Sequence, residues 1–115
     1  MSVERVRYDG MGFSAVKAFS DWRIGMIHRS PFFSRFTYWE RHMQTDEVFI
    51  LLSGHATLYT KNDEGAVEQD EMVPDVLYDV RQGTWHYIII APESTVIVVE
   101  TRDTGRSNSE YDSAL

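Results

Sequence analysis

The sequence predicts an all-β protein in which short strands form a double-sheet sandwich or barrel. Three observations lead to this fold class. The 115 residues amount to one domain with enough length to bury a core. Apolar residues rarely recur at helical spacing, whereas short strand-like runs follow one another from about residue 33 onward. Turn-forming residues separate these runs, as they do in small sandwiches and barrels.

Six strands are expected in the central part of the chain, and turn signals follow most of them. The runs span residues 33–42, 47–52, 56–60, 76–80, 86–91 and 96–101, with turns at 53–54, 62–65, 82–83 and 92–94. Residues 1–31 are expected to add edge strands near 13–19 and 22–27. Residues 104–115 form a polar tail, for which we expect loose order. The whole is therefore read as a single domain with its barrel core at 33–101.

Composition excludes several classes of function. There is no cysteine, so disulfides, thiolate metal sites and cysteine nucleophiles are ruled out. The formal charge of −7 repels phosphate backbones and anionic lipid, which argues against nucleic acid and membrane surfaces as partners. No apolar run has the length of a signal peptide or a membrane span. We therefore expect a cytoplasmic protein that binds a small-molecule ligand.

Four polar residues occur where a barrel would turn them inward. Glu40 and His42 are two positions apart, so they project from one face of their strand, which Tyr38 shares. Glu47 opens the next strand, and His86 opens a later one. All four therefore lie near strand ends, which a barrel can bring together at one mouth. Burying two carboxylates is costly unless they are compensated, and a divalent cation shared with two imidazoles offers that compensation.

The spacing of these residues resembles the two sequence motifs of the cupins, the RmlC-like jelly-roll superfamily. Glu40, His42, Glu47 and Gly54 form the pattern E-x-H-x4-E-x6-G, which resembles the first cupin motif, G-x5-H-x-H-x3,4-E-x6-G. Residues 75–86 (DVLYDVRQGTWH) are similar to the start of the second motif, G-x5-P-x-G-x2-H-x3-N. The resemblance implies a cupin double-stranded β-helix, that is, a jelly-roll barrel.

The motifs also depart from the family pattern. Glu40 stands for the first histidine, and the opening glycine of the first motif is missing. A second register, which would use His42 and Gln44, leaves the spacing to Glu47 one residue short. In the second motif, Asp75, Arg81 and Ile90 replace the glycine, the proline and the asparagine. Carried over by position, His42, Glu47 and His86 match cupin metal ligands, while Glu40 is a plausible substitute and Gln44 a weaker one.

Each of these residues also has a simpler interpretation. His42 alone would be read as a hydrogen-bonded structural histidine, and His86 as the capped first residue of a strand. Glu40 is equally compatible with a solvated position paired with Arg41 or Arg35. These alternatives stay open at the level of sequence.

Three functions are compatible with the resemblance, because the fold hosts many. The leading one is a small cupin that holds Mn, Fe, Ni, Co or Zn. It would bind or convert a small polar metabolite, such as a sugar or a carboxylate. If it is an enzyme, we expect a metal-dependent isomerase, lyase or dioxygenase. There Glu40 is a ligand or a base and Tyr38 orients the substrate. The alternatives are a non-catalytic ligand-binding cupin with a degenerate site and a metal-free sugar-nucleotide isomerase or epimerase in which His42 is the base.

A homodimer is expected from the strands that are apolar on both faces. Residues 47–52, 86–91 and 96–101 lack the polar outer face of an antiparallel sheet exposed to water. If Glu47 points inward, Val48 and Ile50 point outward, as do Ile89 and Ile97 on the other two strands. Large exposed apolar patches are unusual on monomers, so a second subunit is expected to cover this surface.

Overall fold

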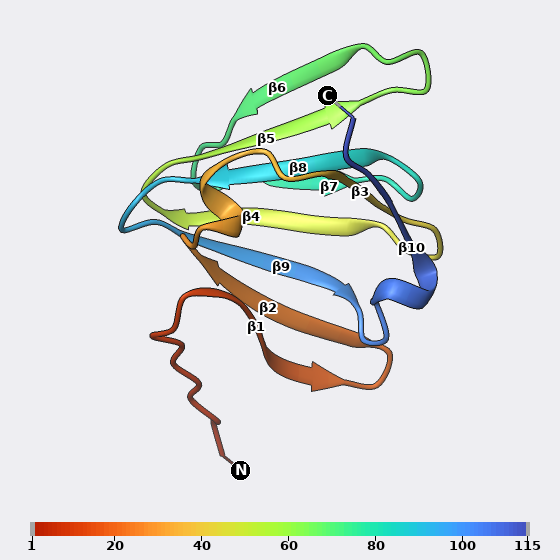
Figure 1. The fold of residues 1–115 in the computed structure, drawn as a ribbon. Coiled ribbons are helices and arrows are strands. Elements are labelled where there is room, and N and C mark those ends of the chain that lie inside the picture. Colours follow the sequence, from red (N-terminus) through yellow and green to blue (C-terminus); the bar gives the residue numbers. More distant parts are fainter. Residues whose placement is uncertain (1, 115) are drawn as a thin grey trace.

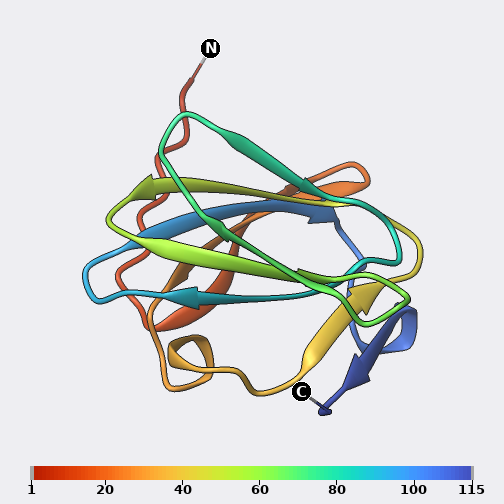
Figure 2. The same cartoon turned by 90° about the horizontal axis from the view of Figure 1, so that it is seen from above.

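The computed structural model describes residues 2–114 and has two antiparallel sheets packed face to face (Figures 1 and 2). Sheet A contains β1 (Gly12–Phe19), β2 (Trp22–His28), β9 (Thr95–Thr101), β4 (Glu47–Ser53) and β7 (Leu77–Val80), in that spatial order. Sheet B contains β10 (Ser109–Asp112), β3 (Trp39–His42), β8 (Trp85–Ile90), β5 (Ala56–Lys61) and β6 (Val67–Glu71). The all-β prediction is confirmed.

The chain passes repeatedly from one sheet to the other. β2, β4, β7 and β9 lie in sheet A, and the strands that follow them, β3, β5, β8 and β10, lie in sheet B. This alternation, visible from above in Figure 2, is the jelly-roll arrangement that the motifs implied. It brings residues from distant parts of the chain to the space between the sheets.

The core is made by alternate residues of the central strands. In β4, Phe49 and Leu51 are buried, and in β9, Val96 and Val98 are buried, while their neighbours along each strand are more exposed. This alternation follows from the two-residue period of a strand. Glu47 belongs to the inward set of β4, so the same geometry that builds the core also buries a carboxylate at one end of it.

One predicted strand differs from the structure. The expectation of one strand over residues 33–42 is wrong, because Phe32–Ser34 form a 3₁₀ turn after Pro31 and only Trp39–His42 form β3. Phe36 leaves the predicted alternation, since its ring packs against Trp39 and Tyr87. Tertiary packing of an aromatic side chain thus overrides the local strand pattern.

The polar tail is more ordered than expected. Ser109–Asp112 form β10, which pairs with β3, and ion pairs join Glu110 to Arg41 and Asp112 to Lys61. Strand β6, whose five residues are all exposed, was also not predicted, because an edge strand facing water on both sides carries no apolar alternation. Among residues 2–114, no helix has the length and apolar character that crossing a bilayer would require.

Candidate functional site

A cavity of about 230 Å³ lies between the two sheets. β2, β4 and β9 of sheet A and β3, β8 and β10 of sheet B all contribute polar side chains to it, and Phe32, Phe33 and Phe13 add aromatic side chains. Glu40, His42, Glu47 and His86 all line it. The structure therefore brings the four residues together as the sequence analysis expected, whereas Gln44 is exposed and is not among the lining residues.

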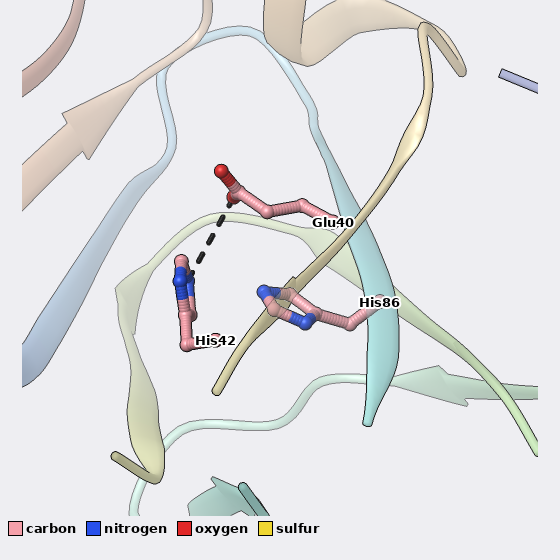
Figure 3. Close-up of side chains that lie close together, drawn as sticks. All are labelled: Glu40, His42 and His86. Carbon is pink, nitrogen blue, oxygen red and sulfur yellow. Dashed lines mark ion pairs between the residues drawn. The ribbon is translucent and has the colours of Figure 1, made fainter. Parts of the chain in front are cut away.

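Strand pairing explains why the two histidines meet. Glu40 of β3 lies directly opposite His86 of β8, and His42 follows two residues later on the same face of β3. Figure 3 shows these three side chains extending into the same space from the two neighbouring strands. The Oε1 atom of Glu40 is 3.8 Å from Nε2 of His42, and the Glu40 side chain is one-third exposed.

Glu47 of the opposite sheet connects the two histidines. Its Oε1 atom lies 3.2 Å from Nε2 of His42 and 2.8 Å from Nε2 of His86. All three side chains are less than 9% exposed. A carboxylate and two imidazoles are thus removed from water as one compact group.

The outer nitrogen of each ring has its own partner. Nδ1 of His86 lies 3.0 Å from the backbone oxygen of Thr84, so this nitrogen carries a proton and donates it. Nδ1 of His42 lies 2.8 Å from Oγ of Ser109 in β10. In neutral His86, Nε2 would present a lone pair to the Glu47 carboxylate. That contact becomes favourable only if Nε2 is protonated or if a cation binds both groups.

The electrostatics of the ion-free site follow from this contact. Burial alone would raise the pKa of Glu47, but the hydrogen bonds from His42 and His86 hold it well below its usual range. Burial likewise opposes protonation of both histidines, yet the hydrogen bond and charge of Glu47 raise the pKa of each. Without an ion, the buried carboxylate therefore favours the protonated form of both histidines.

Sequence reasoning missed two charged residues of the site, Glu100 and Arg23. Glu100 at the end of β9 is buried, and Nε of Arg23 donates a hydrogen bond of 2.6 Å to its Oε2. Arg23 also donates to the backbone oxygen of Thr104 at 3.0 Å. Arg23 belongs to β2 and lines the cavity. The sequence did contain a signal for Glu100, because the two-residue period of the strand places it on the same inward face as Val96 and Val98.

Glu100 adds a second buried acid next to Glu47. Burial, followed by the hydrogen bond and the negative charge of Glu47, raises the pKa of Glu100 to about 8, although Arg23 acts in the opposite direction. Two sets of side chains have ligand-type atoms within 4.8 Å of one another: Glu40 with His42 and His86, and His42 with Glu47 and Glu100. The acidic and imidazole groups therefore form one continuous cluster with His42 in both sets.

Comparison with known proteins addresses the fold. No family model matches the chain, and no curated protein matches it at the level of sequence. Among solved structures, a cupin-2 domain protein from Shewanella frigidimarina aligns over 83% of this chain and 85% of its own, with 20% identity and a TM-score of 0.62. This chain has the cupin fold.

Two other solved structures with this fold are similar to the chain. The sugar 3,4-ketoisomerase QdtA from Thermoanaerobacterium thermosaccharolyticum, solved with TDP, is 17% identical over 80% of this chain and 67% of its own, with a TM-score of 0.66. KdgF from Halomonas sp. is 14% identical over 88% of this chain and 90% of its own, with a TM-score of 0.61. At these identities the likeness concerns the fold, and sugar-related proteins are among the neighbours that share it.

Proposed function

We propose that this protein is a small metal-binding cupin that binds, or acts on, a small polar metabolite such as a sugar or a carboxylate. The observation that carries the proposal is the arrangement around Glu47, where two imidazole Nε2 atoms lie against one carboxylate oxygen inside a cavity. Nδ1 of each ring is engaged elsewhere, so both Nε2 atoms face the cavity group. A divalent cation held by His42, Glu47 and His86 would satisfy all three.

The donor set fits an ion of the first transition series. Two imidazoles and a carboxylate without thiolates suit Mn, Fe, Ni, Co or Zn. Ligand atoms on one such ion, with bonds of about 2.0–2.2 Å, lie roughly 3 Å apart, and the two contacts of Glu47 Oε1 measure 2.8 and 3.2 Å. When bound, such an ion polarises a carbonyl or hydroxyl oxygen of the substrate as a Lewis acid.

Glu40 and Tyr38 are the residues we assign to the substrate side of the cavity. Glu40 is partly exposed beside His42, so its carboxylate is available as a fourth ligand or as a base that accepts a proton from the substrate. Burial, followed by the charge of Glu40, raises the pKa of Tyr38. The Tyr38 hydroxyl therefore stays protonated and is available to donate a hydrogen bond to a substrate oxygen.

The size and lining of the cavity favour a small polar ligand. Its volume of about 230 Å³ lies below the roughly 300–1,000 Å³ of pockets that enclose drug-sized molecules. Arg23 and Arg35 supply positive charge among its lining residues, and Phe32 and Phe33 supply apolar walls. This combination suits a hydroxylated or carboxylated metabolite and leaves little room for an enclosed nucleotide.

A second candidate is a metal-free sugar-nucleotide isomerase or epimerase with the same fold. One observation favours it: with protonated histidines, Glu47 is fully compensated without any ion. In that case His42 would exchange protons with the substrate, and a nucleotide would extend out of the cavity, in keeping with the TDP bound to the QdtA neighbour. A non-catalytic ligand-binding protein is the third possibility, since the first motif histidine is replaced by Glu40.

Metal content tests the proposal directly. Protein purified without an affinity tag should contain close to one divalent transition metal ion per chain by elemental analysis. The double variant His42→Ala/His86→Ala should lose at least tenfold of this content, because two of three ligands are gone. The matched control His55→Ala, at an exposed turn residue, should keep it. If the native protein is metal-free and cannot be loaded with Mn, Fe, Ni, Co or Zn, the proposal is wrong and the metal-free isomerase becomes the leading candidate. Turnover of a nucleotide sugar would then distinguish this isomerase from a non-catalytic binding protein.

Substitution of Glu40 separates its two proposed roles. If Glu40 is a ligand, Glu40→Gln should weaken metal retention against a chelator by about tenfold or more, because an amide oxygen is a poorer donor than a carboxylate. If Glu40 is a base, metal content should stay unchanged and turnover should fall by the roughly 10²–10⁴-fold typical of general base catalysis. If the variant has wild-type metal retention and wild-type activity, Glu40 has neither role and is a solvated strand residue.

A further inference from the structure

The C-terminal strand β10 runs beside His42 at the edge of the cavity. It pairs antiparallel with β3, so that Ser109 lies opposite His42 and Tyr111 lies opposite Glu40 (Figure 2). Directly paired residues of neighbouring strands project from the same face of a sheet, so Ser109 and Tyr111 share the inward face of β3. Ser109 lines the cavity itself. The last strand of the chain therefore borders the candidate site.

Contacts on the outward face support this register. Glu110 accepts a hydrogen bond of 2.9 Å from Nε of Arg41. Asp112 accepts a hydrogen bond of 3.3 Å from Nζ of Lys61. These four side chains are not among those that line the cavity. Outward ion pairs and backbone pairing thus position a strand whose inward side chains reach the site.

The turn before β10 is fixed by the side chain of Asn108. Its Oδ1 atom accepts a hydrogen bond of 2.9 Å from the backbone nitrogen of Gly105, and its Nδ2 atom donates one of 3.1 Å to the backbone oxygen of Asp103. The backbone oxygen of Asn108 in turn accepts a hydrogen bond of 2.9 Å from the backbone nitrogen of Met43. Ser109, the next residue, is therefore placed both by this turn and by the pairing of β10 with β3.

The two histidines of the site differ in the partner of Nδ1. For His86 this partner is the backbone oxygen of Thr84, which no side-chain substitution removes. For His42 it is the Oγ atom of Ser109, at 2.8 Å. The His42 side chain is only 6% exposed, so water is a poor substitute for this partner. His86 is therefore an internal reference for the effect that Ser109 has on His42.

We propose that Ser109 is a positioning residue that fixes the orientation and the tautomer of His42 for cation binding. When Nε2 of His42 is a ligand, the proton of the neutral ring lies on Nδ1. The Ser109 hydroxyl then accepts a hydrogen bond from Nδ1, which keeps the Nε2 lone pair directed at the cavity. The consequence for metal binding rests on the proposed function, whereas the orientation of the ring does not.

Zinc affinity, measured by competition with a chelator, tests the consequence for metal binding. Ser109→Ala should lower the affinity by about 10–100-fold, because Nδ1 of His42 loses its partner inside the protein. Ser109→Thr keeps the hydroxyl and should stay within about threefold of the wild type. Glu110→Gln changes the adjacent residue on the outward face of β10 and should bind zinc as the wild type does. An unchanged affinity in Ser109→Ala, an equal loss in Glu110→Gln, or no rescue by threonine would overturn the proposal.

Nitrogen NMR of the ion-free protein separates this inference from the proposed function. Ser109→Ala should shift the Nδ1 resonance of His42 and leave that of His86 in place, a selective change that a general loosening of the fold would not produce. A wild-type protein that binds no zinc would contradict the proposed function, and the NMR comparison would then decide the role of Ser109 alone. Unchanged His42 resonances in Ser109→Ala would overturn that role whether or not zinc binds.

Discussion

Glu47→Gln is expected to be the most damaging single substitution in the cavity. The amide cannot carry the negative charge that both histidines contact at 3.2 and 2.8 Å. Loss of a charged partner from a buried hydrogen-bonded group costs about 3 kcal/mol, so the free energy of unfolding of the ion-free protein should fall by about that amount. Under the proposed function, the variant should also retain at least tenfold less metal.

The loss of stability should depend on pH in a defined direction. The pKa of Glu47 is lowered by folding, so its contribution is present above its unfolded pKa of about 4.3 and is lost as pH falls through the folded pKa. The pKa values of His42 and His86 are raised, so their contribution is complete below about 6.5 and is lost as pH rises through the folded values. The difference between wild type and Glu47→Gln should therefore be largest between about pH 4.5 and 6.5 and should shrink toward pH 9.

Urea unfolding of chelator-treated protein across this pH range measures the effect. Glu110→Gln provides the control, since Glu110 is half exposed and pairs with Arg41 at the surface. Such pairs contribute about 0–1 kcal/mol, and the control should keep its metal. Equal stability and equal metal retention in Glu47→Gln and Glu110→Gln would show that Glu47 does not hold the site together.

Gly54→Ala is expected to lower the stability by at least a comparable amount, and it acts on the fold alone. Gly54 ends the first motif and follows the last residue of β4, with a φ of +85°. A Cβ atom there would lie 2.7 Å from Cα of Ser94, which is backbone and cannot rotate away. Left-handed strain costs about 1–3 kcal/mol, and overpacking adds about 1–3 kcal/mol, so we expect a loss of roughly 2–6 kcal/mol.

Gly83→Ala separates the two causes. Gly83 has a similar φ of +79°, but a Cβ atom built on it has no neighbour within 4 Å. This variant should show only the conformational cost of about 1–3 kcal/mol, measured by thermal or urea unfolding. If the two alanine variants are equally stable, the close approach of Gly54 to Ser94 has no energetic importance, and the glycine of the motif is explained by its φ angle alone.

The part of the candidate site that depends on spacing within one strand could be predicted from the sequence. Glu40 and His42 share a face because a strand repeats every two residues, and Glu47 faces inward because it starts an apolar strand. The structure brings both together with His86. Ser109 and Arg23 were not predictable in this way, because each reaches the site through strand pairing across a long sequence separation. Glu100 had a local signal in its strand alternation, but nothing in the sequence indicated that Arg23 would compensate its burial.

The sequence by itself determined the strand content, the turns and the order of the motif residues, because these depend on side-chain periodicity and on backbone preferences over a few residues. The tertiary structure decided which strands share a sheet. That separated the outward faces of β4 and β9 from that of β8, and it turned a polar tail into β10 beside His42. Sheet membership depends on hydrogen bonds between segments far apart in the chain, whose energy is not encoded in any short stretch of sequence.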